Sequence, residues 1–461
     1  MANKLIWGPT FAEMLSPEKI APEIREKALA LKDKEPLDPI NLYNITWKKA
    51  DGTPCYLVLP QALTGVDANI IVLYGRDFPT ASHKVGATYA VTMEKQLLGE
   101  IEPGVHTVVY PSTGNYGIGG AWVGGRMGYD ALVILPELMS KERFELINRY
   151  GARYIKTPGC ESSVKEIYDQ CKKLARQPQT KILNQFEVMA NYRFHYYVTG
   201  NTIAQLVRAL GEQGIGDGSC AVFVSAMGSA GTIAAGDRLK EVFSGHKIVG
   251  VEPIQCPTLY CNGYGDHDIQ GIGDKHVTWI HNVLNMDALV CVDDMEAKLG
   301  LQLLTDPVGL EYLETKAGIS GEMLQQLATV FGISGVANVL GAIKMAKYYR
   351  LPANANVVTI LTDAIDRYHS VMSALDQQFG RFNQEKAAQR YWGIFHRVKL
   401  DYIQEGTPLN RERWFNLKYY TWVEQQGKTV DELNAQRSES WWQEQRAKIA
   451  EIDRRLEKVR G

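Results

Sequence analysis

The chain has 461 residues, of which 45% are hydrophobic and 22% are charged, and its formal net charge is −2. This length suits two or three domains with sizeable cores. The small net charge gives no electrostatic reason to expect a nucleic-acid or membrane partner, and no apolar run approaches the ~20 residues of a membrane-spanning helix. The seven cysteines contain no CxxC pair. With no signal-peptide pattern at the N-terminus, we expect reduced thiols, no metal site and a cytoplasmic location.

Residues 1–45 are expected to form an N-terminal arm. Ser16-Pro17-Glu18 has the capping hydroxyl and first-turn proline of a helix start, which predicts a helix from there to about Lys32. The prolines at positions 36 and 39 end this helix.

Short β-branched runs then alternate with helical stretches. Most of these runs are continuously apolar, which is typical of strands buried on both faces of a helix-covered parallel sheet. The pattern therefore predicts an α/β architecture, with ligands bound beyond the carboxyl ends of the strands. The predicted strands are residues 70–74, 107–110, 131–135, 153–156, 221–225, 247–251, 288–292 and 357–361.

Lys84 is the first candidate functional residue. It follows the strand at 70–74 and lies just before a predicted helix at 87–98. The positive end of that helix should lower the pKa of the lysine, and a neutral amine can attack a carbonyl group. The alternative is a solvated lysine on the surface.

Two loops that follow predicted strands could bind anions. The segment 112–117 (Ser-Thr-Gly-Asn-Tyr-Gly) combines small residues with hydrogen-bonding side chains, although it could be a simple turn. The glycine-rich segment 225–232 precedes a predicted helix at 233–243, as in phosphate-binding loops, but it matches neither a Walker A nor a dinucleotide motif. A phosphate site together with a candidate amine nucleophile suggests pyridoxal 5′-phosphate.

The order of these three stretches resembles that of the fold-type II pyridoxal-phosphate enzymes of the tryptophan synthase β superfamily. Further segments are similar to the cysteine synthase and cystathionine β-synthase branch, namely Asn184-Gln185-Phe186, Gly250 to Pro253, Ile269 to Gly273, Gly332 to Gly335 and Asp366 to Ser370. The resemblance spans residues 74–370. It implies a two-domain α/β fold and a homodimer.

The expected division of the chain follows from this resemblance. A large cofactor domain would comprise residues 46–85 and 200–380, and a small substrate-binding domain would comprise residues 86–199. Residues 381–461 would be a helical C-terminal extension without strands, packed on the core or on a partner subunit.

The resemblance also implies roles for single residues. Lys84 would be the catalytic residue and the Schiff-base lysine, and Asn115 would bind the cofactor's 3′-oxygen. Thr362 would contact the pyridine nitrogen, with Asp363 pointing into the loop. The remaining cofactor-binding residues would be His83, Gly228, Ser229, Ala230, Gly231 and Thr232, and the substrate-binding residues would be Ser112, Thr113, Gly114 and Gln185.

The implied activity is a cysteine-synthase-like β-replacement on a small amino acid, through an aminoacrylate intermediate. Two alternatives remain open: a β-elimination lyase of the cysteine desulfhydrase or serine/threonine dehydratase type, and a non-catalytic homologue acting as a binding subunit. The sequence departs from the family pattern at Val85-Gly86, Tyr116 and Thr362-Asp363, which leaves the substrate open.

Overall fold

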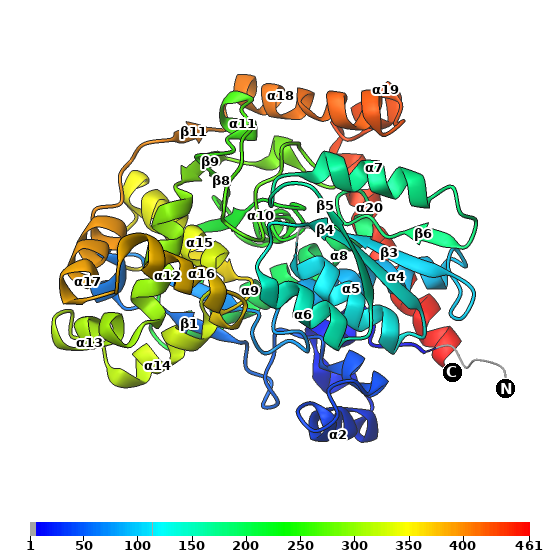
Figure 1. Ribbon diagram of the computed structural model, residues 1–461, viewed down its shortest axis with the longest axis horizontal. Helices are drawn as coiled ribbons and strands as arrows, with labels where there is room; N and C mark the ends of the chain where they lie inside the picture. Colours follow the sequence, from blue (N-terminus) through cyan, green and yellow to red (C-terminus); the bar gives the residue numbers. More distant parts are fainter. Residues whose placement is uncertain (1–5, 113) are drawn as a thin grey trace.

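The computed structural model describes residues 6–112 and 114–461, and in these ranges the strands form two sheets (Figure 1). The larger sheet has seven strands, which are parallel except for the antiparallel edge strands β1 and β11. Their order is β1 (Tyr56–Val58), β2 (Asn69–Tyr74), β10 (Asn356–Leu361), β7 (Val222–Ala226), β8 (Lys247–Pro253), β9 (Ala288–Val292) and β11 (Ile403–Glu405).

The smaller sheet is entirely parallel, in the order β5 (Arg153–Thr157), β4 (Asp130–Pro136), β3 (Thr107–Pro111) and β6 (Thr180–Ile182). Strands β7 and β10 are buried along their whole length, as their continuously apolar sequences predict. All eight predicted strands are present, within two residues of their expected limits. The α/β prediction is therefore confirmed.

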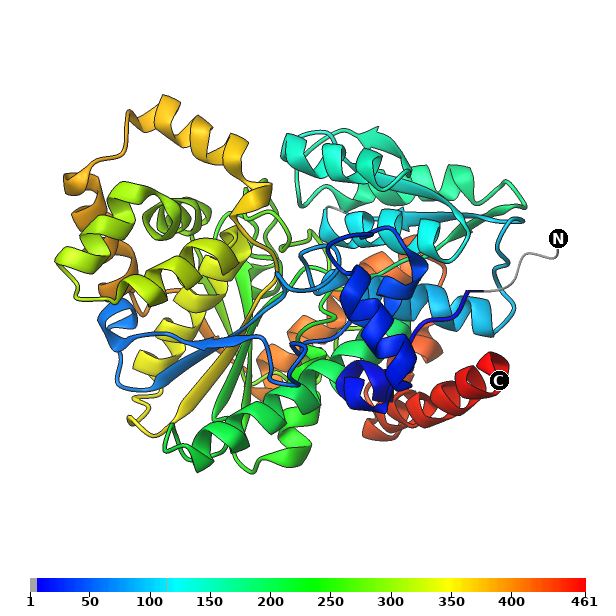
Figure 2. The same ribbon diagram turned by 90° about the horizontal axis from the view of Figure 1, so that it is seen from below.

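The register of the large sheet brings the two candidate cofactor segments together. Val357 in β10 pairs with Ile70 in β2 on one side and with Val222 in β7 on the other. Because these strands are parallel, the turn leading to Lys84 and the loop after β7 both follow carboxyl ends of strands and lie at the same end of the sheet. Each sheet lies among its own group of helices (Figures 1 and 2).

The helices between residues 61 and 379 cover the two sheets. They are α3 (Gln61–Thr64), α4 (Lys84–Leu97), α5 (Asn115–Arg126), α6 (Lys141–Arg149), α7 (Val164–Leu174), α8 (Met189–Phe194), η3 (His195–Thr199), α9 (Gly200–Glu212), α10 (Ala234–Val242), α11 (Thr258–Cys261), η4 (Val283–Asn285), α12 (Asp294–Thr305), α13 (Pro307–Thr315), α14 (Gly321–Val330), α15 (Ile333–Tyr348), η5 (Ile365–Arg367) and α16 (His369–Phe379). In the described ranges no single helix is long and apolar enough to cross a membrane. Taken together, α14 and α15 are long and apolar enough, but the pair is bent by 118°.

The N-terminal arm differs from the prediction of one helix between Ser16 and Lys32. It contains α1 (Phe11–Leu15), η1 (Pro17–Lys19), α2 (Pro22–Leu31) and η2 (Pro39–Asn44). Ser16-Pro17 starts only a single 3-10 turn. Ala21 precedes a proline and adopts an extended conformation, with ψ of 131°, so the chain leaves the helical path and starts a new helix.

The C-terminal extension is not purely helical, contrary to expectation. Its helices are α17 (Gln384–Arg390), η6 (Tyr391–His396), α18 (Pro408–Asn416), η7 (Tyr420–Gln425), α19 (Val430–Ala435) and α20 (Glu439–Arg460). Between them, β11 pairs with β9 and so adds an edge to the large sheet. A strand of three residues is too short to give a sequence pattern.

The last helix packs against the N-terminal arm (Figure 2). Trp442, Ile449 and Leu456 of α20 are buried in the same core cluster as Phe11 of α1. The Asp453 carboxylate accepts hydrogen bonds from the backbone N–H groups of Phe11, at 2.8 Å, and Ala12, at 3.0 Å. The two ends of the chain are therefore held together by a helix cap as well as by apolar contacts.

Candidate active site

Lys84 is buried, with 8% of its surface exposed, so the alternative of a solvated surface lysine is wrong. It is the first residue of α4, and its Nζ donates a hydrogen bond of 2.9 Å to Ser229 Oγ in the glycine-rich loop. The turn before it is tight: a Cβ at Gly75 would lie 2.7 Å from His83 N and 2.8 Å from Thr362 O. Three segments that are distant in sequence thus meet at this lysine.

Burial lowers the pKa of Lys84 to about 8, and the negative charges of Asp274 and Glu161 oppose the shift. The sequence led us to expect a lowered pKa from the helix dipole, whereas the main cause is the removal of the ammonium group from water. At pH 7 roughly a tenth of such lysines carry a neutral amine, compared with well under a thousandth at the ordinary pKa. The amine can therefore act as a nucleophile or as a base.

The glycine-rich loop between β7 and α10 has the geometry of an anion cradle. Ala230 has a φ of 58°, in the left-handed region that favours glycine. The backbone N–H groups of Ser229, Ala230 and Thr232 have no protein acceptor in the described part of the chain. A Cβ at Gly231 would lie only 2.1 Å from Asn191 Oδ1, and one at Gly228 would lie 3.2 Å from Gly271 O. This arrangement fits a phosphate group.

His83 lies beside this loop, with its Nε2 at 3.3 Å from Thr232 Oγ1. Its ring stacks on Trp47, with 5.3 Å between ring centroids, and it is completely buried. Burial and the neighbouring Lys84 hold the pKa of His83 well below its ordinary value. The imidazole is therefore neutral at pH 7 and can act as a hydrogen-bond partner, but it brings no charge to the loop.

Asn115, at the start of α5, connects to the end of β10. Its Nδ2 donates a 2.6 Å hydrogen bond to Asp363 Oδ2, which also accepts one of 2.8 Å from the Tyr368 hydroxyl. Arg367 donates to Asn115 Oδ1. Asp363 therefore does not point into the loop, as we expected, but into the protein, with its side chain fully buried. Thr362 is buried next to it, and its role at the pyridine nitrogen stays a prediction.

Arg143 is a site residue that the sequence did not reveal. It belongs to α6, a mostly charged helix that resembles a solvated surface helix, yet its side chain is fully buried. Its Nη2 donates to the Tyr368 hydroxyl at 2.9 Å and lies 3.6 Å from Asp363 Oδ2. A Cβ at Gly114 would lie 2.1 Å from Arg143 Nη1, so only glycine fits there. Arg143 thereby links the small sheet to the end of β10.

The expected substrate loops lie on the small-sheet side of the site. Ser112 Oγ accepts a 2.9 Å hydrogen bond from the backbone N–H of Gly114. Gln185 is buried, and its Nε2 donates to Pro111 O at 3.3 Å. Thr113 lies outside the described residues. The loops lie next to each other after β3 and β6, and the contacts assigned to their side chains remain predictions.

The fold agrees with the comparisons. The chain belongs to the pyridoxal-phosphate dependent enzyme family, which matches residues 51–363, more than half of its length. It is 30% identical over 294 residues to a probable cysteine synthase of Bacillus subtilis, covering 63% of this chain and 85% of the relative. Cysteine synthase B of Campylobacter jejuni is also 30% identical, over 297 residues, 64% of this chain and 88% of the relative.

Two solved structures show the same fold. A cysteine synthase from Entamoeba histolytica has a TM-score of 0.58 at 24% identity, over 75% of this chain and 93% of its own. A hydrogen sulfide-producing enzyme from Fusobacterium nucleatum has a TM-score of 0.56 at 25% identity, over 70% and 88%. The protein is therefore a fold-type II pyridoxal-phosphate enzyme of the cysteine synthase and cystathionine β-synthase branch.

The residues present fit this cofactor. The loop provides free N–H donors for its phosphate, and a buried amine of lowered pKa lies at hydrogen-bond distance from the same loop. The amide of Asn115 is held in place by Asp363 and Arg367. Pyridoxal phosphate thus has an attachment point, an anion site and a fixed polar contact in one buried place.

Proposed function

We propose that the enzyme replaces a substituent at the β-carbon of a small amino acid, as a cysteine-synthase-like transferase. The observation that carries this is the 2.9 Å contact between Lys84 Nζ and Ser229 Oγ, which joins the reactive amine to the phosphate loop. The identity of 30% to cysteine synthases supports the choice of reaction.

The bound cofactor supplies an electron sink for the negative charge that develops at the substrate Cα. Lys84 would hold the cofactor through its amine, and as a free neutral amine it would remove the Cα proton and hold it. Burial keeps water away from this proton transfer. Ser112, Thr113, Gly114 and Gln185 are proposed to hold the substrate carboxylate, which orients the Cα–H bond.

The attachment site is tested by sodium borohydride reduction of the holoenzyme followed by peptide mapping. We expect the reduced cofactor on Lys84 and loss of the visible cofactor absorbance in Lys84→Ala. Lys95→Ala is the matched control, because Lys95 lies on the same helix but forms an exposed ion pair with Glu100. A variant Lys84→Ala that keeps the bound colour would exclude Lys84 as the anchor.

Replacement and elimination are separated by their products. From O-acetyl-L-serine, replacement gives acetate and a new amino acid, which is cysteine if sulfide adds and serine if water adds, whereas elimination gives acetate, pyruvate and ammonia. The likeness to a hydrogen sulfide-producing enzyme supports elimination from cysteine as the second candidate. A purified protein that contains the cofactor but converts none of serine, O-acetylserine, cysteine and threonine would support a binding subunit instead.

We also propose that the enzyme is a cytoplasmic homodimer. Within each subunit we place the domain boundaries at residues 85–86, 199–200 and 380–381. Light scattering coupled to gel filtration measures the mass of the particle directly. Limited proteolysis should cut first near residues 380–381, which are exposed, because residues 85–86 and 199–200 lie in buried helices.

A further inference from the structure

Asp274 is a buried carboxylate that the roles described above do not use. It directly follows the Gly-Ile-Gly turn after β8, and 6% of its surface is exposed. The backbone around it is fixed, because Gly273 N donates to Met227 O at 2.7 Å and Thr258 Oγ1 donates to Asp274 O at 2.9 Å. Its Oδ2 is buried and has no hydrogen-bond partner in the described part of the protein.

Asp274 interacts electrostatically with Lys84, Tyr168 and Cys256. Lys84 in turn interacts with Glu161, His83 and His195. Burial raises the pKa of Asp274 to about 7, and the positive charge of Lys84 opposes the rise. The carboxylate therefore lies within electrostatic reach of the reactive amine and changes its charge near neutral pH.

Glu252 shows what a structural carboxylate in the same region looks like. It is also buried with a pKa raised to about 7, but it accepts backbone N–H bonds from Leu259, at 2.8 Å, and Tyr260, at 3.2 Å, at the start of α11. Asp274 has no such donors. A buried carboxylate oxygen without a partner is unfavourable for folding, so its presence within electrostatic reach of Lys84 indicates a function.

We propose that Asp274 is the acid–base residue for the group exchanged at the β-carbon, and that the incoming second substrate is a neutral O–H compound, with water as its simplest member. As the new O–Cβ bond forms, the carboxylate accepts the O–H proton. When a basic substituent leaves, the protonated carboxyl returns that proton to it as the Cβ–X bond breaks. The inference rests on the proposed function and assigns its nucleophile.

The charge of Asp274 gives the reason for this choice of nucleophile. A neutral hydroxyl group is a weak nucleophile and gains from a base that takes its proton. A hydrosulfide anion needs no base, and a carboxylate beside the β-carbon repels it. The site is therefore better suited to oxygen than to sulfide.

β-Chloro-L-alanine in H₂¹⁸O tests the proposal, because chloride leaves without a proton and the ¹⁸O label shows water addition in the serine formed. In wild type we expect the rate to fall as the pH drops below about 7, where Asp274 is protonated. Asp274→Asn should lower this rate at least 100-fold and remove the fall at low pH. Asp266→Asn is the matched control in the same loop, since Asp266 is exposed and paired with Lys275.

Exchange of the substrate Cα proton in D₂O separates the two proposals. If wild type neither exchanges the Cα proton nor releases chloride from β-chloro-L-alanine, the proposed function fails, whatever Asp274 does. If wild type exchanges but Asp274→Asn forms ¹⁸O-serine at the wild-type rate and with the same pH profile, the inference on Asp274 is overturned. The same holds if wild type adds hydrosulfide but no water.

Carboxyl NMR of the holoenzyme with ¹³C-labelled aspartate gives a test independent of turnover. Burial raises the pKa of Asp274 to about 7 and that of Asp453 to about 6, so wild type and Asp266→Asn should show both signals, whereas Asp274→Asn should lack the one near pH 7. If Asp274→Asn does not fold, Asp274→Glu, which keeps the acid at a changed position, takes its place and should slow water addition more than Cα exchange. Spectra in which Asp274→Asn removes no signal that titrates near neutrality would overturn the inference.

Discussion

Lys84 combines a reactive amine with an unfavourable burial. Because its pKa in the folded protein is lowered to about 8 from 10.5, the cationic form destabilises the fold below pH 8, and this effect disappears as the pH rises to about 10.5. Lys84→Met keeps the length of the side chain without the charge. We expect it to raise the free energy of unfolding of the cofactor-free protein by roughly 1–3 kcal/mol at pH 7.

Urea unfolding at pH 7 and pH 10 measures this effect. The difference between Lys84→Met and wild type should shrink at the higher pH. A variant that is less stable than wild type at pH 7 would mean that the contact with Ser229 outweighs the burial of the charge.

Gly231 is fixed by a single neighbour. Because a Cβ there would lie 2.1 Å from Asn191 Oδ1, Gly231→Ala displaces the side chain whose Nδ2 holds Ser229 Oγ at 3.1 Å. We expect at least a tenfold loss of cofactor affinity, about 1.4 kcal/mol, and a larger one in Gly231→Asp, where a carboxylate meets the phosphate. Titration of the cofactor by absorbance measures this. Gly125→Ala is the control, since the nearest atom would be 3.7 Å away.

Thr362 and Asp363, directly after β10, are the two candidates for contact with the pyridine nitrogen, and substitutions distinguish between them. Thr362→Val should impair turnover if the threonine faces the pyridine nitrogen. Asp363→Asn removes the charge that faces Arg143 and replaces the charged acceptor of Asn115 Nδ2 by a neutral amide. We expect Asp363→Asn to weaken cofactor binding, as measured by the same absorbance titration. If Asp363→Asn binds normally and Thr362→Val does not, the ion-pair network has no part in holding the cofactor.

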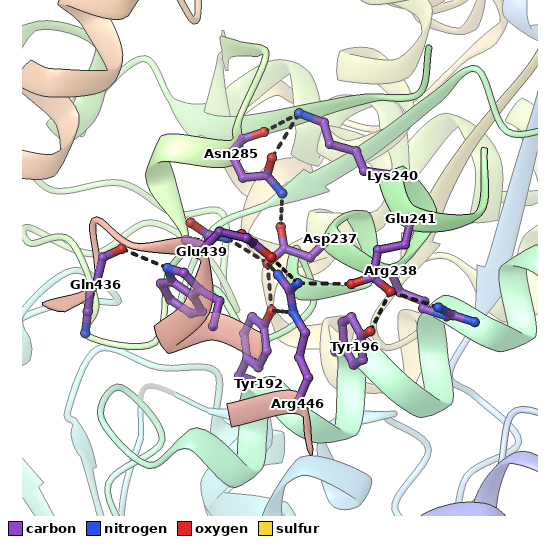
Figure 3. Close-up of polar contacts among 12 residues, drawn as sticks. Tyr192, Tyr196, Asp237, Arg238, Lys240, Glu241, Asn285, Gln436, Glu439 and Arg446 are labelled. Atoms are coloured by element: carbon purple, nitrogen blue, oxygen red, sulfur yellow. Dashed lines mark hydrogen bonds and ion pairs between the residues drawn. The ribbon is translucent and has the colours of Figure 1, made fainter. Parts of the chain in front are cut away.

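At the scale of single elements, α20 is attached to the fold by Arg446 (Figure 3). Its guanidinium donates to the Tyr192 hydroxyl at 3.0 Å and to Asp237 Oδ2 at 3.3 Å, and these partners belong to α8 and α10. Glu241 and Glu439 accept further bonds, at 3.0 and 2.6 Å. The arginine thus joins three helices that are distant in sequence.

Arg446→Leu should lower the free energy of unfolding by about 3–5 kcal/mol, because it leaves the buried Asp237 without its cation. Arg454→Leu on the same helix is the control, since Arg454 is exposed and bonds only to the carbonyl of Ala450, and we expect a change within about 0.5 kcal/mol. Equal effects of the two substitutions would show that the network in Figure 3 carries no stability.

Elements were predictable where their pattern is long and apolar, and the missed ones have local causes. The strands at 70–74 and 357–361 could be located because both of their faces are buried. Arg143 could not, because its burial is set by Tyr368, which is 225 residues away along the chain. The break at Ala21 has a local cause in the sequence, because the residue before a proline disfavours the helical conformation. Asp274 carried a visible signal, a carboxylate right after a glycine turn.

For the whole molecule, the C-terminal extension is part of both the sheet and the core. Deleting residues 438–461 exposes the sites of Trp442, Ile449 and Leu456 and removes the Asp453 carboxylate from the start of α1. Burial of three such side chains contributes roughly 5 kcal/mol, so we expect a large fall in the free energy of unfolding. Urea unfolding measures it, and gel filtration shows whether the shortened chain aggregates. Unchanged unfolding would mean that α20 packs only loosely.

Deletion of all residues after Gly380 tests the broader role of the extension. It also removes β11 and so leaves β9 as an open edge of the large sheet. We expect low solubility, measured as the fraction of protein in the supernatant after expression. A soluble, folded chain of residues 1–380 would mean that the extension serves assembly or substrate access alone.

The cap that Asp453 forms on α1 has a consequence during synthesis on the ribosome. The N-terminal arm is synthesised before its partner helix, because Asp453 follows Phe11 by 442 residues. Since a ribosome adds about 5–20 residues per second, the arm waits for at least ~20 seconds before it can dock. During that time its apolar side chains are available to chaperones. A stalled chain that lacks α20 would therefore expose the apolar side chains of the N-terminal arm to the cell's quality control.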